Sequence, residues 1–247
     1  MSETIGRLLA VGNVAEIFEW GSCALKLYKS NDAKPAAFRE AAIHAAAETL
    51  GLPVPKVWSV QKIGDRWGIV FDRVVQSSFA EKMSNSPDDI TRYLECMVQL
   101  HLRIHAHAAI QLASLKVRLA ANITATKLLD EPRKHRLLAG VADMPDGDRL
   151  CHGDFHPMNI LGDPSQPVII DWPDARRGDP AADVCRSYLL MKLHVVEIAT
   201  PYLDAYCRMS GVARESVLRW LPYVAGAKLA EGVPSELDGL IRIVRSS

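Results

Sequence analysis

The chain has 247 residues, which is enough for one large domain or for two lobes with a sizeable core. Hydrophobic residues make up 49% of it and charged residues 23%, a balance that is ordinary for a soluble globular protein. The formal net charge is zero, so bulk electrostatics give no reason to expect nucleic acid as a partner.

The cysteine spacing and the apolar stretches indicate the cellular compartment in which the protein is expected. The five cysteines are scattered and show no C-x-x-C spacing, which is typical of free thiols in a reducing cytoplasm. The first residues lack the basic start and apolar core of a signal peptide. The most apolar late stretch, Tyr188 to Ala199, is short and interrupted by charges, so we expect a cytoplasmic protein without a membrane partner.

The first part of the chain is predicted to form an antiparallel sheet with one helix. Alternating apolar residues separated by Gly and Asn turns predict a meander of hairpins. The expected strands are 5–11, 14–20, 22–28, 56–62 and 66–70. Between the third and fourth strands, Pro35 suits a first helical turn and Gly51 a helix end, which predicts a helix over residues 35–50.

From Phe79 onward the apolar spacing is helical. The expected helices are 88–109, 110–130, 133–139, 181–193, 200–210, 215–229 and a last one after Pro234. A strand-rich part followed by a helical part predicts an α+β, two-lobed fold. We place the lobe boundary after Arg73, with an N-terminal lobe over residues 1–73 and a C-terminal lobe over residues 74–247.

The most informative motif lies at residues 152–171. It has the pattern H-x-D-x-x-x-x-N, with Asp154 and Asn159 five positions apart, followed by Asp171 at the end of a β-branched run. This is the catalytic-loop and metal-site arrangement of kinase-fold phosphotransferases. Magnesium prefers oxygen ligands, which a strand-end carboxylate and an amide supply, while a separate carboxylate can accept the proton of an attacking hydroxyl.

These polar residues have two other possible interpretations. The segment is rich in turn formers, so a plain surface turn is one alternative, and a zinc site from His152, Asp154 and His156 is another. Pro157 and the unused asparagine fit the zinc site poorly, and His152 is better explained as a residue that packs and hydrogen-bonds the loop. His101 and His105, four apart on a predicted helix, are a possible metal pair, but core histidines that pack beside the loop are favoured.

Residues 151–183 resemble the signature of the aminoglycoside phosphotransferase family. That family also includes choline, homoserine, methylthioribose and fructosamine kinase relatives. Its pattern is H-G-D-x-x-x-x-N, a strand, I-D-W/F and then G-D-P-x-x-D, and the last part is present here as Gly178, Asp179, Pro180 and Asp183. The resemblance implies a protein-kinase-like fold, with an N-terminal antiparallel sheet plus helix and a mostly helical C-terminal lobe.

The resemblance also implies roles for the motif residues. Asp154 would be the catalytic base, and Asn159 and Asp171 the magnesium ligands. Asp179 and Asp183 would be structural and would tie the metal loop to the following helix. The implied cofactors are ATP (or GTP) and Mg²⁺.

Lys26 is a lone charge inside an apolar strand, and a buried ammonium needs an anion or water as a partner. An exposed strand face is the alternative, but the catalytic motif favours Lys26 as the lysine that binds the nucleotide phosphates. Glu40 and Glu48 are the acidic helix residues that could pair with it. The family places this glutamate early in the helix, so Glu40 is the better match.

Two backbone segments complete the expected nucleotide site. The turn at Gly12 and Asn13 would cover the phosphates with backbone N–H groups, although a plain hairpin turn explains it equally well. The segment from Asp72 to Val74 resembles the hinge between lobes, where backbone groups would bind adenine.

We therefore expect an ATP- and Mg²⁺-dependent phosphotransferase that moves a γ-phosphoryl group to a hydroxyl of a small molecule. Family analogy offers an aminoglycoside, an amino alcohol, homoserine or a sugar as the acceptor, and zero net charge weakens the case for a polycation. The alternative is a nucleotide-binding pseudokinase with a regulatory role. The sequence leaves open the acceptor, ATP versus GTP, the oligomeric state and the role of Arg176 and Arg177.

Overall fold

The computed structural model describes residues 4–246 and divides into two compact units. Unit 1 comprises Met1–Asn85 and Pro157–Pro173, and unit 2 comprises Ser86–His156 and Asp174–Ser247. The chain passes from unit 2 to unit 1 between His156 and Pro157, inside the catalytic-loop motif. Asp154 therefore belongs to unit 2, whereas Asn159 and Asp171 belong to unit 1.

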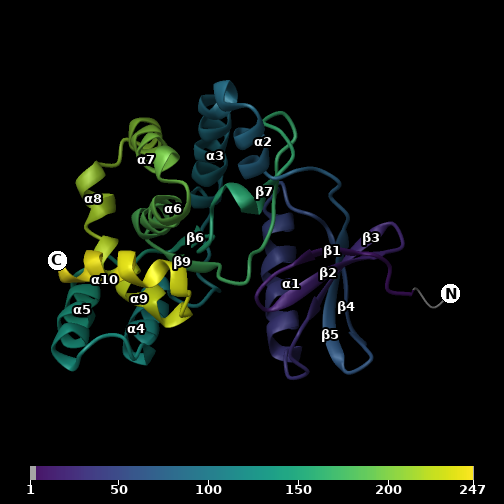
Figure 1. Ribbon diagram of the computed structural model, residues 1–247, viewed down its shortest axis with the longest axis horizontal. Helices are drawn as coiled ribbons and strands as arrows, with labels where there is room; N and C mark the ends of the chain where they lie inside the picture. Colours follow the sequence, from purple (N-terminus) through teal and green to yellow (C-terminus); the bar gives the residue numbers. More distant parts are fainter. Residues whose placement is uncertain (1–3, 247) are drawn as a thin grey trace. The chain divides into compact units, whose positions relative to one another are not determined.

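Unit 1 is built on a five-stranded antiparallel sheet with the strand order β1-β2-β3-β5-β4 (Figure 1). The strands are β1 (Leu8–Val11), β2 (Ala15–Trp20), β3 (Cys23–Tyr28), β4 (Val57–Ile63) and β5 (Arg66–Asp72). Two hairpins turn at Gly21 and Gly64, both with φ of 58°, a left-handed conformation that glycine adopts without strain. All five predicted strands are present, although β1 begins at Leu8 rather than at residue 5.

The alternation of side chains along β3 positions the future site. Leu25 and Leu27 are buried on one face of the sheet. Tyr28 packs on the other face with Ala37 and Ala41 of helix α1 (Lys34–Thr49), which lies along the sheet in Figure 1. Because successive strand residues point to opposite faces, Lys26 shares the α1 face with Tyr28.

The second segment of unit 1 follows the catalytic loop. It contains the short helix η2 (Pro157–Asn159) and the strands β7 (Ile160–Leu161) and β8 (Val168–Ile169). Backbone hydrogen bonds attach it to the rest of unit 1, since the Gly162 N–H donates to the Ser77 carbonyl at 2.9 Å and the Ile169 N–H to the Pro53 carbonyl at 2.7 Å. Helix α2 (Phe79–Asn85) contacts η2.

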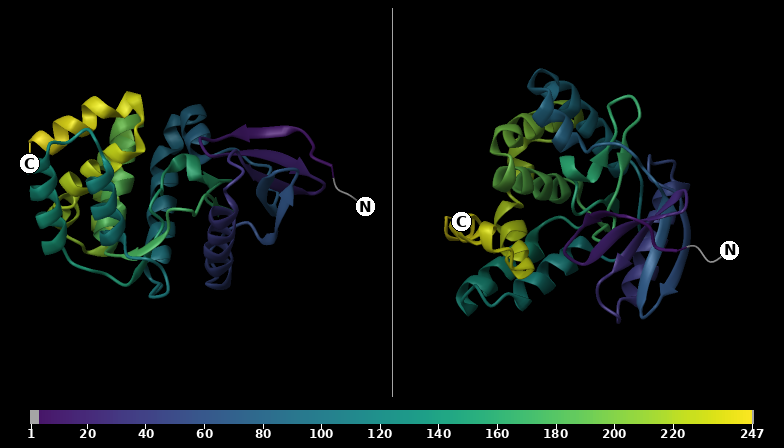
Figure 2. Two further views of the ribbon diagram at one scale, coloured as in Figure 1. Left: turned by 90° about the horizontal axis from the view of Figure 1, so that it is seen from below. Right: turned by 45° about the vertical axis from the view of Figure 1, so that its right-hand side comes forward.

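Unit 2 is mostly helical. Its elements are η1 (Pro87–Asp89), α3 (Ile90–His105), α4 (Leu115–Ala125), α5 (Glu131–Asp143), β6 (Arg149–Cys151), β9 (Arg176–Gly178), α6 (Pro180–His194), α7 (Val196–Ser210), α8 (Arg214–Leu218), α9 (Leu221–Lys228), η3 (Leu229–Glu231), η4 (Pro234–Glu236) and α10 (Leu237–Arg245). Helix α6 contacts α7, α8 and α9, and α9 in turn contacts α4, α5 and α10 (Figure 2). Because α6 starts at Pro180, the last residue of the G-D-P motif, the motif anchors the centre of this unit.

Two predicted helices differ from the observed ones. The helix predicted over residues 110–130 is α4 alone, because the chain before it forms backbone bonds with the β6 region, such as Ala109 N–H to the Asp148 carbonyl at 2.8 Å. The helix predicted over residues 215–229 is split into α8 and α9, since Pro222 has no N–H to continue the hydrogen-bond ladder.

The α+β fold class is confirmed, with the antiparallel sheet in the N-terminal part and helices dominating the C-terminal part. The five cysteines, all within residues 4–246, are free thiols, as predicted. None of the helices in this part of the chain combines the length and the apolar character that crossing a bilayer would need.

Candidate active site

Lys26 is paired with anions, as expected for a charged residue inside an apolar strand. Its Nζ lies 2.7 Å from Oε1 of Glu40 and 2.6 Å from Oδ1 of Asp171. Burial works to lower the pKa of Lys26, but the two carboxylates outweigh burial and raise it above its ordinary value. The ammonium is therefore charged, and Glu40 rather than Glu48 is the helix residue that holds it.

Glu40 is itself held by a residue that the sequence reasoning missed. The hydroxyl of Tyr28 donates to its second carboxylate oxygen, Oε2, and both side chains are buried. Burial and the adjacent Glu40 carboxylate raise the pKa of Tyr28, so the phenol stays protonated and can donate. The alternation Lys26-Leu27-Tyr28 was the available signal, because residues two apart on a strand share a face.

Asp171 has a backbone conformation that is unusual for a non-glycine residue. Its φ is 65°, in the left-handed region, and it is the one non-glycine residue with positive φ among residues 4–246. Such conformations cost free energy and are concentrated at functional sites. The side chain is 41% exposed, so one face of the carboxylate is open to a ligand while Lys26 holds Oδ1.

Asn159 is placed close to Asp171 by a backbone hydrogen bond. Its carbonyl accepts from the N–H of Ile170 at 3.0 Å, the residue directly before Asp171. The donor set that the two side chains offer, one carboxylate and one amide oxygen, is the hard-oxygen chemistry that suits Mg²⁺. The residues present therefore fit the metal that the sequence implied.

The two backbone segments expected to contact the nucleotide lie next to strands of unit 1. Gly12 and Asn13 are exposed between β1 and β2, and the Gly12 N–H donates to the Ala15 carbonyl at 2.9 Å. Asp72 ends β5, and its N–H donates to the Lys56 carbonyl at 2.9 Å within unit 1. Val74 follows outside any helix or strand and is partly buried.

Asp154 lies in unit 2 between two cationic or potentially cationic side chains. Its carboxylate is 3.3 Å from Nε2 of His156 and 3.5 Å from a terminal guanidinium nitrogen of Arg186. Burial raises the pKa of Asp154, but His156 and Arg186 outweigh burial and hold it well below its usual range. Asp154 is therefore ionised at neutral pH and ready to accept a hydrogen bond from a hydroxyl.

The loop before Asp154 is anchored by Asp183. This fully buried carboxylate accepts from the N–H of His152 at 2.7 Å and from that of Gly153 at 2.8 Å. It also accepts from Nε2 of His101 at 2.9 Å and from Nε2 of His105 at 3.1 Å. Burial raises the pKa of Asp183, but these donors lower it well below the usual range, so it remains ionised.

The two histidines are held at their other ring nitrogens as well. Nδ1 of His101 is 2.5 Å from the Tyr202 hydroxyl, and Nδ1 of His105 is 2.8 Å from the Tyr206 hydroxyl. Burial, followed by the neighbouring His105, lowers the pKa of His101 to about 3, so it is neutral.

His101, His105 and Asp183 are close enough to hold a metal, the one such group among residues 4–246. Hydrogen bonds already account for this group, since the imidazole N–H groups point at a carboxylate that backbone amides also bind. This arrangement supports the packing role expected for the histidines. The alternative zinc set of His152, Asp154 and His156 does not form such a group within this part of the chain. Instead, the buried His152 accepts the Asp154 N–H at its Nδ1, which supports its expected role in the loop.

Arg186 links Asp154 to a second charged network. Its other terminal nitrogen lies 2.7 Å from Glu231, and Lys228 lies 2.8 Å from Glu231 and 2.6 Å from Glu236. Burial lowers the pKa of Arg186, but Glu231 and Asp154 raise it above its ordinary value. The carboxylates of Glu231 and Glu236 are thus both paired with cations.

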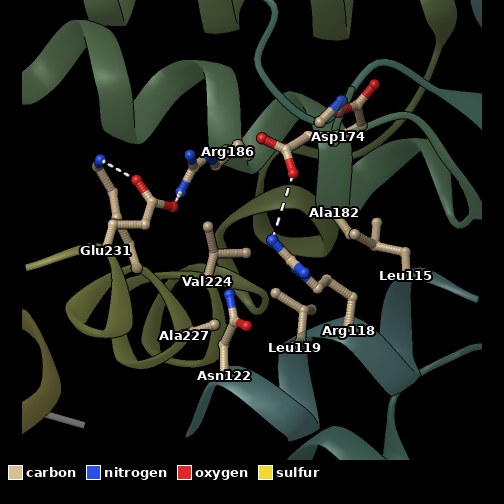
Figure 3. Close-up of a pocket in the computed structure, with 13 residues that line it drawn as sticks. Leu115, Arg118, Leu119, Asn122, Asp174, Ala182, Arg186, Val224, Ala227 and Glu231 are labelled. Atoms are coloured by element: carbon tan, nitrogen blue, oxygen red, sulfur yellow. Dashed lines mark hydrogen bonds and ion pairs between the residues drawn. The ribbon is translucent and has the colours of Figure 1, made fainter. Parts of the chain in front are cut away.

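A pocket opens beside the catalytic loop within unit 2 (Figure 3). Gly153, Asp174 and Arg186 line its loop side, and residues of α4, α6, α9 and η3 line the rest. Figure 3 shows Arg118 reaching toward Asp174 and Arg186 reaching toward Glu231. The remaining lining residues are Leu115, Leu119, Asn122, Ala182, Asp183, Val224, Ala227 and Lys228.

Arg176 and Arg177, whose role the sequence left open, lie on β9 and pair with β6. Arg176 donates to the Ala175 carbonyl at 2.6 Å, and Arg177 to the Gly147 carbonyl at 3.4 Å. Neither is among the residues that line the pocket.

Comparison with solved structures identifies the fold. The chain is similar to the apo form of a thermostable mutant of aminoglycoside phosphotransferase APH(4)-Ia, with a TM-score of 0.73 and 15% identity over 98% of this chain and 95% of that one. It is also similar to aminoglycoside-3'-phosphotransferase of type VIII, with a TM-score of 0.65 and 22% identity over 92% and 93%. A third match is APH(3'')-Id from Streptomyces rimosus, with a TM-score of 0.60 and 18% identity over 88% and 91%. The predicted kinase-like fold is thereby confirmed.

A search among curated proteins finds no match. The sequence profile of the phosphotransferase enzyme family (APH) matches residues 18–221, which is more than half of the chain. That range includes Lys26, Glu40, Asp154, Asn159 and Asp171. The chain therefore belongs to the phosphotransferase enzyme family and is a phosphotransferase of the kinase type.

Proposed function

We propose that this protein transfers the γ-phosphoryl group of ATP to a hydroxyl of a small molecule in a magnesium-dependent reaction. The observation that carries the proposal is the bridge Glu40–Lys26–Asp171, because it pairs a lysine with a helix carboxylate and with the carboxylate expected to bind metal. Similar folds are known in complex with ADP and hygromycin B and with ADP and streptomycin, which supports a nucleotide donor and a small-molecule acceptor.

The residues of unit 1 bind and orient the donor. Lys26 neutralises charge on the α- and β-phosphates, and Glu40 keeps its ammonium in place. Asn159 and Asp171 hold Mg²⁺, which when bound neutralises the charge that builds up between the phosphates. The backbone N–H groups at Gly12 and Asn13 cover the phosphates, and the backbone between Asp72 and Val74 binds adenine.

Asp154 acts on the acceptor. Its carboxylate accepts a hydrogen bond from the acceptor hydroxyl and aims the oxygen at the γ-phosphorus. As the new O–P bond forms, the bond from the γ-phosphorus to the bridging oxygen breaks, ADP leaves with that electron pair, and the hydroxyl proton passes to Asp154. Because the pKa of Asp154 is well below its usual range, it is a weak base, which suits a loose transition state in which the proton moves late.

A product screen tests the proposal. Purified protein with ATP or GTP and Mg²⁺ is offered aminoglycosides, amino alcohols, homoserine and sugars, and products are sought by mass spectrometry as a gain of about 80 daltons. Lys26→Met is expected to abolish product and to weaken ATP binding about ten- to a hundredfold, the value of one or more charge-assisted contacts. Lys62→Met is the matched control, since Lys62 lies on β4 of the same sheet in an exposed pair with Asp65.

The outcomes separate the proposal from its rival. Product that requires Lys26 supports the transfer reaction. ATP binding that requires Lys26, without product from any acceptor and without hydrolysis of ATP, favours the nucleotide-binding pseudokinase.

A further inference from the structure

The pocket beside the catalytic loop carries an unusual charge pattern for a site that would receive a polycation. Three cationic side chains, Arg118, Arg186 and Lys228, are among its lining residues. Its acidic residues are already paired with cations or with hydrogen-bond donors. To reach Asp183 or Glu231, a polycationic acceptor would have to displace buried partners, which is costly. Asp174, in an exposed pair with Arg118, is the exception.

The acidic residues are engaged one by one. Glu231 binds Arg186 at 2.7 Å and Lys228 at 2.8 Å. Asp183 accepts two histidine N–H groups and two backbone amides. Asp174 faces Arg118.

Of these three cations, Arg118 is the one that a ligand can bind most readily. It is 49% exposed, and its ion pair with the 42% exposed Asp174 is long, at 3.4 Å. Exposed pairs of this kind contribute little free energy, so a ligand carboxylate can replace Asp174 at small cost. The planar guanidinium fits a carboxylate with two parallel hydrogen bonds.

The surroundings of Arg118 suit a small hydroxylated carbon skeleton. Asn122 lies one helical turn further along α4 and adds an amide to the same pocket, and Leu119 and Val224 add apolar surface. Arg186 contributes a buried Nε that has no hydrogen-bond partner among residues 4–246, and a ligand oxygen would satisfy it.

Taken together, the geometry points to an acceptor that carries a carboxylate as well as the hydroxyl, with Arg118 binding the carboxylate and Asp154 the hydroxyl. We infer that this protein phosphorylates a small hydroxy acid and not a polycationic aminoglycoside. The inference rests on the proposed phosphotransfer for its hydroxyl end, whereas the carboxylate end rests on the pocket alone.

Matched acceptor pairs test the inference. Initial rates of ADP release are measured with D-glycerate and glycerol, 4-hydroxybutyrate and 1,4-butanediol, and L-homoserine and its reduced alcohol. Glycerol 3-phosphate probes a phosphate in place of the carboxylate, and hygromycin B and streptomycin probe polycations. We expect kcat/KM for at least one acid to exceed that of its neutral partner about ten- to a hundredfold, as one charged hydrogen-bonded pair provides.

Two variants with opposite expected effects separate recognition from damage to the fold. Arg118→Gln is expected to remove the preference for the acid, mainly through KM, while Asp174→Asn frees Arg118 and is expected to lower KM for the acid. Arg136→Gln, an exposed arginine on α5, is the matched control. Binding of D-glycerate and 4-hydroxybutyrate is followed by NMR on the same proteins with a non-hydrolysable ATP analogue and Mg²⁺.

The result that overturns the inference is turnover confined to neutral alcohols, glycerol 3-phosphate or aminoglycosides, or Arg118→Gln and Arg136→Gln behaving alike. Failure of every acid to bind or react overturns it as well. Aminoglycoside turnover would refute the carboxylate class while leaving the phosphotransfer intact. Arg118-dependent binding of an acid without any transfer would refute the phosphotransfer while leaving the carboxylate site intact.

Discussion

Replacing Asp183 with Asn removes the charge that holds the catalytic loop to α6. The carboxylate receives four N–H donors, from His152, Gly153, His101 and His105. Oδ2 accepts three of these bonds and Oδ1 accepts the one from Gly153. An amide that keeps its oxygen at the Oδ2 position therefore loses the Gly153 bond and leaves the other three donors without a charged acceptor. A bond to a charged acceptor contributes about 1.5–3 kcal/mol and one to a neutral acceptor about 1 kcal/mol. One lost bond and three weakened bonds should together lower the free energy of unfolding of Asp183→Asn by roughly 3 kcal/mol or more.

Urea denaturation followed by circular dichroism measures this loss. The control is Asp179→Asn at the N-cap of α6, where Asp179 accepts the Ala181 N–H at 2.9 Å. Asparagine caps helices as well as aspartate does, so the control should cost about 1 kcal/mol or less. If Asp183→Asn does not yield folded protein, Tyr206→Phe removes one hydroxyl from the same network and should cost about 1 kcal/mol.

The pH dependence of the same measurement checks the charge. The folded-state pKa of Asp183 is lowered, so its stabilisation is present above the unfolded value of about 3.9 and is lost as the pH falls through the folded pKa. The difference between wild type and Asp183→Asn should therefore shrink in acid below about pH 4. A loss under about 1 kcal/mol at pH 7, equal to that of the control, would refute the reasoning.

Three further predictions concern the site. Tyr28→Phe removes the hydroxyl that holds the Glu40 carboxylate, so the Kd for ATP, measured by titration calorimetry, should rise by a few fold. An unchanged Kd would show that the hydroxyl does not have this role. Gly153→Ala would place a Cβ 2.5 Å from the Asp174 carbonyl oxygen at a φ of +83°, so its thermal midpoint should fall by several degrees, and a neutral result would contradict the loop geometry. Arg186 helps to lower the pKa of Asp154, so Arg186→Gln should move the acid limb of the pH profile of kcat to higher pH. An acid limb at the same pH would show that Arg186 does not have this effect.

Local signals in the sequence predicted the fold well. Alternation and glycine turns identified the five strands of unit 1, and Pro35 and Gly51 marked the ends of its helix. The errors lie where tertiary contacts override local spacing. Residues 106–114 read as helix by apolar spacing but give their backbone groups to β6 and β9, while Pro222 interrupts a run that is otherwise helical.

The candidate site was predictable only where chemistry is encoded locally. The catalytic motif and the lone charge of Lys26 pointed to their residues directly. The link from Arg186 to Glu231 joins α6 to the segment after α9, and no local pattern predicts such a pairing. The histidine and tyrosine pairs, each spaced by four on α3 and α7, did carry a signal, since equal spacing allows two helices to match along their facing sides.

The central claim is that Asp154 accepts the hydroxyl proton and does not bind the nucleotide. The most direct test is kcat for phosphoryl transfer and Kd for ATP measured on the same preparation of Asp154→Asn, with the exposed Asp148→Asn as a matched control. The account predicts a fall in kcat of about a thousandfold with the Kd for ATP within about twofold of wild type. Activity retained within about tenfold, or equal loss of transfer and ATP binding, would contradict the account.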